Sequence, residues 1–168
     1  MKKLLAGSFA FCVLLVVTVA AANTNFAGTW VLDKSKSEGL QRGMDTAQSI
    51  TMVVTQDDKQ ITTETKVVGQ DGTARPSQPF TYKLDGSKTN VEVTGRMPAK
   101  ATLSAKWTDG GKTLELNQDR VMNMQGNEVN VSIKDHLELS GDGKVLKVHR
   151  TTDSPMGSQE SKLTFNKQ

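Results

Sequence analysis

Apolar and polar residues alternate with period two along most of the chain from Gln48 onward. Such alternation is typical of strands with one buried face. Turn-forming pairs such as Asp85-Gly86 and Asp142-Gly143 separate the runs, and they suit tight hairpins because glycine readily adopts positive φ. The pattern predicts an all-β protein with about ten antiparallel strands, at residues 28–33, 48–56, 59–69, 77–84, 87–94, 99–108, 111–124, 127–140, 144–153 and 159–166.

The predicted hairpins agree with one another. If each turn dipeptide forms the loop, apolar residues face apolar residues in five pairs: Val54 with Ile61, Phe80 with Val91, Ala105 with Leu114, Met124 with Val129, and Leu139 with Leu146. A shift of one residue would move a strand's apolar side chains to the other face. A long meander with one apolar face is best closed on itself, because closure removes exposed edges. We therefore expect an up-and-down antiparallel β-barrel of about 8–10 strands.

The first 22 residues have the pattern of a secretory signal peptide. Lys2 and Lys3 precede an apolar run at residues 4–19, and small residues follow at 20–22. This predicts cleavage near Ala22, a secreted or periplasmic protein without a membrane span after cleavage, and a single barrel domain at 23–168. An uncleaved membrane anchor is the alternative. Lipidation of Cys12 is disfavoured because Phe11 stands where a small residue is needed.

Charge and residue content exclude several classes of function. Lys and Arg number 21 and Asp and Glu 18, and the signs alternate, so no basic stripe indicates nucleic-acid binding. The only cysteine lies in the leader, which removes thiol and disulfide chemistry from the domain. No nucleophile elbow, phosphate loop or metal-ligand cluster is present. The sequence predicts a non-enzymatic protein without cofactor, and it indicates no oligomeric state.

Gly28-Thr29-Trp30, preceded by Asn25-Phe26, opens the first predicted strand directly after the leader. This stretch resembles the G-x-W motif of the lipocalins and the wider calycin group, and residues 28–36 resemble secreted bacterial lipocalin-like proteins of uncharacterised function. The resemblance implies a barrel closed at one end by Trp30, with Gly28 allowing close backbone approach. It also implies a late-strand arginine stacked on Trp30, for which Arg150 is the candidate. The alternative is that Trp30 is an ordinary core residue.

Alternation places charged residues on the inner face of the late strands. The expected registers put Gln118 opposite Asp135, Asp135 opposite Arg150, and Arg120 diagonal to Asp135. Buried charges must be paired or hydrated. Two guanidinium groups against one carboxylate leave a positive charge that suits a ligand carboxylate or another anion. The alternative is a purely structural Asp135–Arg150 pair, with Arg120 reaching the barrel mouth.

Methionines at inward positions, namely Met52, Met122 and Met124, suit an adaptable apolar pocket, although such residues more often belong to an ordinary core. The low aromatic content of 5% leaves few bulky side chains to fill the barrel. The sequence therefore predicts an interior site for a small apolar or amphipathic ligand, including an anionic one. Met122 and Met124 would contact its tail and Arg120 or Arg150 its polar end. Alternatives are a filled barrel that acts through its outer surface or residues 34–47 on a protein or cell-wall partner, and an enzyme with a divergent barrel site.

The outer face carries two histidines. The expected register places His136 opposite His149, with Asn117 on the other side of His136 and Glu138 diagonal. Paired histidines can share a zinc or copper ion, but a metal site usually requires three or four ligands. We therefore expect a solvated surface pair without metal.

Overall fold

The computed structural model describes residues 22–41, 43–95, 97–124 and 126–168, with the side chain of Met124 excepted. Apart from Ala22, the predicted signal peptide lies outside the described residues. The described chain forms ten strands: β1 Gly28–Leu32, β2 Ser49–Gln56, β3 Gln60–Val68, β4 Phe80–Lys83, β5 Thr89–Val93, β6 Ala99–Thr108, β7 Thr113–Met124, β8 Asn127–Leu139, β9 Val145–Ser154 and β10 Gly157–Lys167. The 3-10 helices η1 (Lys34–Lys36) and η2 (Asp109–Gly111) complete the elements. The predicted all-β class and the ten strands are confirmed.

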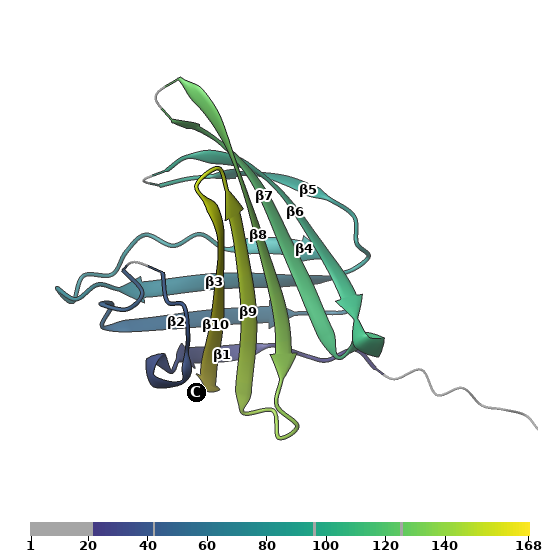
Figure 1. Ribbon diagram of the computed structural model, residues 1–168. Helices are drawn as coiled ribbons and strands as arrows, with labels where there is room; N and C mark the ends of the chain where they lie inside the picture. The colour runs from purple at the N-terminus through teal and green to yellow at the C-terminus, as the bar shows by residue number, and fades with distance from the viewer. Residues whose placement is uncertain (1–21, 42, 96, 125) are drawn as a thin grey trace, which may run out of the picture.

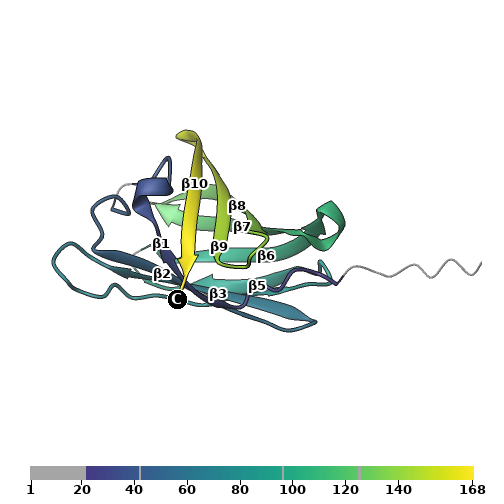
Figure 2. The ribbon, with the colours of Figure 1, turned by 90° about the horizontal axis from the view of Figure 1, so that it is seen from below.

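The strands form one antiparallel sheet that curls into a nearly closed barrel of the calycin-like type (Figure 1). Their order is β4-β3-β2-β1-β10-β9-β8-β7-β6-β5, so β1 pairs with both β2 and β10 and brings the first and last strands side by side. Seen from below, β2 and β3 form one side of the barrel and β7 and β8 the other (Figure 2). Over the residues that the structure describes, no helix is long and apolar enough to cross a membrane.

The barrel wall is interrupted between β4 and β5. These are the only consecutive strands in the described chain that do not pair, so the expected contact of Phe80 with Val91 is wrong. Predicted strand 77–84 is reduced to four residues, and Pro76 and Pro79 stand just before it. Proline has no N–H for a ladder and is confined to strand edges and beginnings. The irregular residues before β4 therefore cannot continue a backbone ladder toward β5.

The hairpin registers follow the real turns rather than the predicted dipeptides. Leu139 faces Leu146 as expected. Three other pairs are wrong by two residues, because Val54 faces Thr63, Ala105 faces Leu116, and Met122 faces Val129. The first shift arises because Asp57 N donates to Gln60 O, which makes 58–59 the loop. A shift of two keeps each side chain on its face, so the predicted inner and outer faces are confirmed.

One end of the barrel is filled by aromatic side chains. Trp30 and Phe26 are fully buried, and the Trp30 indole Nε1 donates to Phe26 O at 3.0 Å. Gln56 ties down the chain before β1 because its carboxamide accepts from Phe26 N and donates to Thr24 O, both at 2.9 Å. The expected stacking of Arg150 on Trp30 is wrong: Lys167 Nζ lies 5.2 Å from the indole centroid, and Arg150 binds Asp135 instead.

Gly28, the first residue of β1, has a φ of 153°, a backbone conformation that residues with a side chain rarely adopt. A Cβ built there would lie 3.1 Å from Lys167 Cε and 3.4 Å from Trp30 Nε1. The glycine therefore allows the lysine and the indole to pack directly over the start of the strand.

The irregular segment at residues 34–47 packs against β10. Glu38 and Lys162 form an isolated bridge, and the buried Ser161 hydroxyl donates to Gly39 O at 2.7 Å. Lys34 Nζ donates to Ala47 O at 2.7 Å and so ties the two ends of the segment together. The segment is thus anchored at several points.

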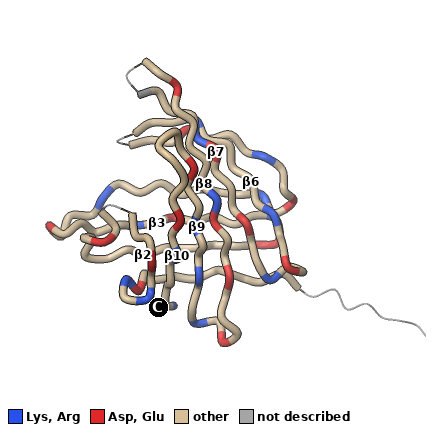
Figure 3. Tube along the Cα trace, viewed as in Figure 1, with Lys and Arg blue, Asp and Glu red and all other residues tan. Residues whose placement is uncertain are grey.

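Basic and acidic residues are mixed along the strands in Figure 3 rather than gathered on one of them. The inner face, by contrast, is mostly apolar, and its largest fully buried side chains include Trp30, Tyr82, Phe26 and Phe165. The charged residues Arg120, Asp135 and Arg150 of that face line one cavity.

Candidate functional site: the barrel cavity

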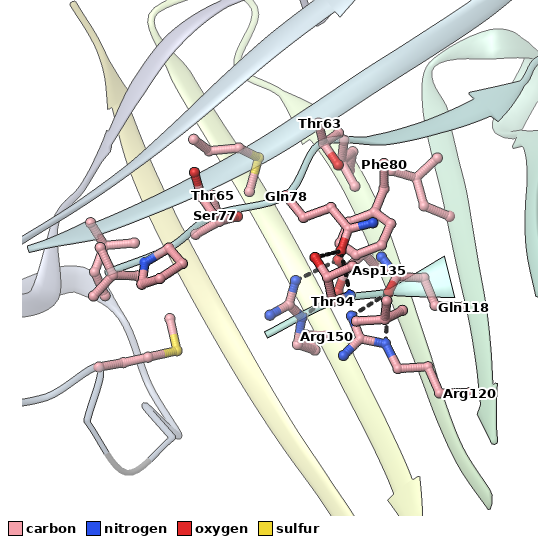
Figure 4. A pocket seen from close by; sticks show the side chains of 18 residues that line it. Thr63, Thr65, Ser77, Gln78, Phe80, Thr94, Gln118, Arg120, Asp135 and Arg150 are labelled. Atoms are coloured by element: carbon pink, nitrogen blue, oxygen red, sulfur yellow. Dashed lines mark hydrogen bonds and ion pairs between the residues drawn. The ribbon is translucent and has the colours of Figure 1, made fainter. Parts of the chain in front are cut away.

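A cavity of about 310 Å³ lies inside the barrel and reaches the gap between β4 and β5. Its apolar lining comes mainly from β2, β3, β7 and β8, through Ile50, Met52, Val67, Leu116 and Leu137. Its polar lining comprises Gln118, Arg120, Asp135 and Arg150 together with hydroxyl side chains of β3 and the residues next to the gap (Figure 4). The cavity therefore has one apolar and one polar part.

Arg150 and Asp135 form a two-point ion pair across β8 and β9. Arg150 Nε donates to Asp135 Oδ1 and Nη2 to Oδ2, each at 2.7 Å. Burial by itself would lower the pKa of Arg150, but the adjacent Asp135 carboxylate outweighs it, so the pKa is raised. The expected pairing of these two residues is confirmed. The pair neutralises one guanidinium within the cavity wall.

Arg120 occupies a different environment. Its Nε and Nη2 donate to Gln118 Oε1 at 3.0 and 2.6 Å, and its guanidinium carbon lies 5.5 Å from the centroid of the Phe80 ring. Among the described residues, Arg120 has no ion pair with a carboxylate. Burial lowers its pKa from the ordinary value, and the nearby Arg150 charge acts in the same direction. Arg120 is therefore a half-buried cation held by a neutral amide and a ring.

Gln118 connects Arg120 to Tyr82. The Gln118 amide nitrogen donates to the Tyr82 hydroxyl, while its carbonyl oxygen accepts from Arg120, so both ends of the carboxamide are used. Tyr82 is 1% exposed, and burial raises its pKa to about 12. The phenol is therefore neutral at physiological pH. Because the Tyr82 hydroxyl accepts this hydrogen bond from Gln118, its own proton does not take part in the bond.

The structure corrects the expected arrangement of the polar row. Asp135 faces Leu116 rather than Gln118, and Arg120 faces Val131, two positions further from Asp135 than a diagonal neighbour. The cause is the shift of two residues between β7 and β8. Gln118, Arg120, Asp135 and Arg150 nevertheless line one cavity.

The methionines are distributed differently from the expectation. Met52 lines the cavity, as does Met44 from the segment before β2. Met122 is half-buried at the edge of the core and is not among the described residues that line the cavity. The side chain of Met124 lies outside the described part of the structure. A ligand in this cavity would contact Met44 and Met52 rather than Met122.

Several cavity residues were not singled out from the sequence. Thr63 and Thr65 line it from β3, and they share parity with the inward Ile61, which would have identified them. Tyr82, the only tyrosine, does not itself line the cavity, but from an inward position of β4 it contacts the lining residue Gln118. Gln78 and Thr94 come from irregular residues beside the gap, where alternation carries no signal.

The outer histidines lie opposite each other, as expected, with ring centroids 6.5 Å apart. Glu115, rather than the expected Asn117, faces His136, and its Oε2 lies 2.8 Å from His136 Nε2. His149 Nε2 lies 3.6 Å from Glu160 Oε2. Within the described ranges no group of three His, Cys, Asp or Glu side chains is arranged to hold a metal ion.

No family model matches this sequence, and no curated protein matches it. Among solved structures, the barrel is similar to zebrafish ileal bile acid-binding protein in complex with cholic acid. The TM-score is 0.50 and the identity 14%, over 85% of this chain and 98% of the zebrafish chain. At this identity the likeness concerns the fold.

Proposed function

We propose that this protein is an exported, non-enzymatic binding protein that holds a small amphipathic anion inside its barrel. The observation that carries the proposal is the state of Arg120. A buried charge is costly unless it is paired, and the contacts described for Arg120 are a neutral carboxamide and an aromatic ring. A carboxylate, sulfonate or phosphate would supply the missing charge and accept from the guanidinium.

The Arg150–Asp135 pair explains why one anion is expected rather than two. Asp135 uses both oxygens on Arg150, so it does not compensate Arg120 directly. A second anion at Arg150 would have to displace a two-point pair. The interior therefore offers a single net positive charge, next to Gln118.

The size and lining of the cavity favour a compact ligand. Small-molecule sites usually have volumes of about 300–1,000 Å³, and this one has about 310 Å³. Ile50, Met52 and Val67 provide apolar contacts for a tail, and methionine adapts to irregular shapes. The bound cholic acid of the zebrafish protein is itself an amphipathic acid, which supports this class of ligand without identifying the ligand here.

A fluorescence titration with anilinonaphthalene sulfonate, an amphipathic anion, tests the proposal. Removing the guanidinium in Arg120→Ala should weaken binding at least about tenfold, because a charge-assisted bond in a partly dry site is lost. The matched control is Arg75→Ala, which removes an exposed arginine and should leave affinity unchanged. Failure of the native protein to bind the probe, or equal binding by Arg120→Ala, would contradict the proposal and favour the outer-surface role.

Export rests on residues 1–22 and is tested separately. Fractionation of the native host, followed by mass spectrometry of the purified protein, should find a mature N-terminus at Asn23 outside the cytoplasm. A protein that retains its leader would instead favour the membrane-anchor interpretation.

A further inference from the structure

One glutamine side chain spans the interruption of the barrel wall. Gln78 Nε2 donates to Glu92 O at 2.8 Å, and Gln78 Oε1 accepts from Thr94 N at 2.9 Å and from the Thr94 hydroxyl at 3.2 Å. Glu92 is in β5 and Thr94 directly follows it, whereas Gln78 lies just before β4. The carboxamide thus pairs with the edge of β5 as a peptide group of a neighbouring strand would.

The backbone beside Gln78 offers few donors for such pairing. Pro79 follows Gln78 and has no N–H to donate, and Pro76 restricts the chain two residues earlier. Between the other consecutive strands, continuous ladders join the wall. Across the interruption between β4 and β5, the hydrogen bonds among the described residues are those of Gln78. This is the part of the wall that can open without separating a ladder.

The interruption leads to the ligand site. Gln78, Phe80 and Thr94 all line the cavity (Figure 4), so the Gln78 carboxamide lies where the interruption of the wall meets the interior. The guanidinium of Arg120 lies over the ring of Phe80, the first residue of β4. A molecule that passed between β4 and β5 would arrive beside the unneutralised cation.

We propose that the anion enters and leaves the barrel between β4 and β5, and that Gln78 is the clasp that sets the rate of this exchange. The proposal rests on the function proposed above. Rotation of one half-buried side chain breaks all three bonds, and such rotations are fast compared with the separation of paired strands. The clasp should therefore control the rates of association and dissociation much more than the affinity.

Stopped-flow mixing with anilinonaphthalene sulfonate measures both rates. In Gln78→Ala we expect association and dissociation each to accelerate at least about fivefold, with the dissociation constant changed less than about twofold. Gln60→Ala, an exposed glutamine at the start of β3, is the matched control and should behave as the native protein. Unchanged rates in Gln78→Ala would overturn the proposal and indicate entry at another place.

A second measurement does not depend on ligand binding. In a Cys12→Ser background, Met52→Cys places a thiol on the cavity wall, and its alkylation by iodoacetamide reports entry of a small molecule. Adding Gln78→Ala should raise the alkylation rate at least about fivefold. Val148→Cys, a buried site that does not line the cavity, controls for general loosening and should react at an unchanged rate.

The two measurements separate the two proposals. If the native protein fails to bind the probe but alkylation at Met52→Cys depends on Gln78, the anion proposal fails and the entry route stands. If Arg120→Ala abolishes probe binding but neither rate responds to Gln78→Ala, the ligand site stands and the entry route is wrong. Equal acceleration at Met52→Cys and Val148→Cys would also contradict the clasp, because it would indicate global destabilisation.

Discussion

Arg150 and Asp135 face each other across β8 and β9 and share two parallel hydrogen bonds of 2.7 Å. Each residue points into the barrel, and their side chains are 24% and 12% exposed. Because the carboxylate is fully used by one arginine, the second arginine on the cavity wall, Arg120, is left with neutral partners. The single carboxylate therefore pairs with Arg150 alone, and the uncompensated positive charge of the interior lies at Arg120.

Asp135→Ala should lower the free energy of unfolding by about 3 kcal/mol, because it leaves a mostly buried guanidinium without its partner. Urea denaturation monitored by tryptophan fluorescence measures the change. Glu160→Ala, which removes the carboxylate near the exposed His149, should cost less than about 1 kcal/mol. Equal losses for the two variants would show that the interior pair is not specially stabilising.

Tyr82 should titrate with a pKa of about 12 in the folded protein. It is the only tyrosine of the chain, so the near-ultraviolet absorbance of the phenolate reports it alone. Since the unfolded chain releases this proton near pH 10, folding stability should fall as pH rises from about 10 toward about 12. A folded-state midpoint near 10 would mean that the phenol is accessible to water.

Asp33 should contribute stability that is lost in acid. Hydrogen bonds from Ser35 and Lys36, and then Asn166, lower its pKa from 3.8 to about 2. A depressed folded-state pKa means that the contribution is complete above about pH 4 and disappears as pH falls toward about 2. The difference in unfolding free energy between the native protein and Asp33→Asn should therefore shrink over that interval. A difference independent of pH would exclude this role.

Gly28→Ala should destabilise the protein by about 1–3 kcal/mol, because a residue with a Cβ is strained at its φ of 153°. The new Cβ would also press on Lys167 Cε at 3.1 Å. Thermal unfolding compares it with Gly141→Ala, at a glycine whose φ is ordinary and whose built Cβ meets nothing within 4 Å. A similar effect of both substitutions would show that the conformation of Gly28 carries no special cost.

Much of the architecture was predictable because strand periodicity is a local property. Alternation located all ten strands and assigned inner and outer faces, since a face depends only on parity. The exact partners were less predictable, because the length of each turn decides them. Between β2 and β3 the loop lies one residue later than predicted, and every residue of β2 therefore faces a β3 residue two positions further along the chain than predicted. Between β7 and β8, a separate shift of two residues moved Gln118 away from Asp135.

The candidate site was only partly predictable for a different reason. Asp135 and Arg150 lie on adjacent strands, so a correct register was enough to join them. Tyr82, by contrast, reaches Gln118 across the interior from β4, a contact that no neighbouring-strand argument provides. Likewise, Lys167 rather than Arg150 covers Trp30, because the last strand pairs with the first.

The order of the strands means that the pairing of the first with the last strand and the missing ladder lie at different places in the wall. The first and last strands, β1 and β10, pair directly. The backbone between β4 and β5 is continuous where hydrogen bonding is not. A circular permutant that joins residue 168 to residue 23 and begins at Ser87 would therefore have every pair of bonded strands adjacent in sequence, and it would convert this barrel into a simple linear meander.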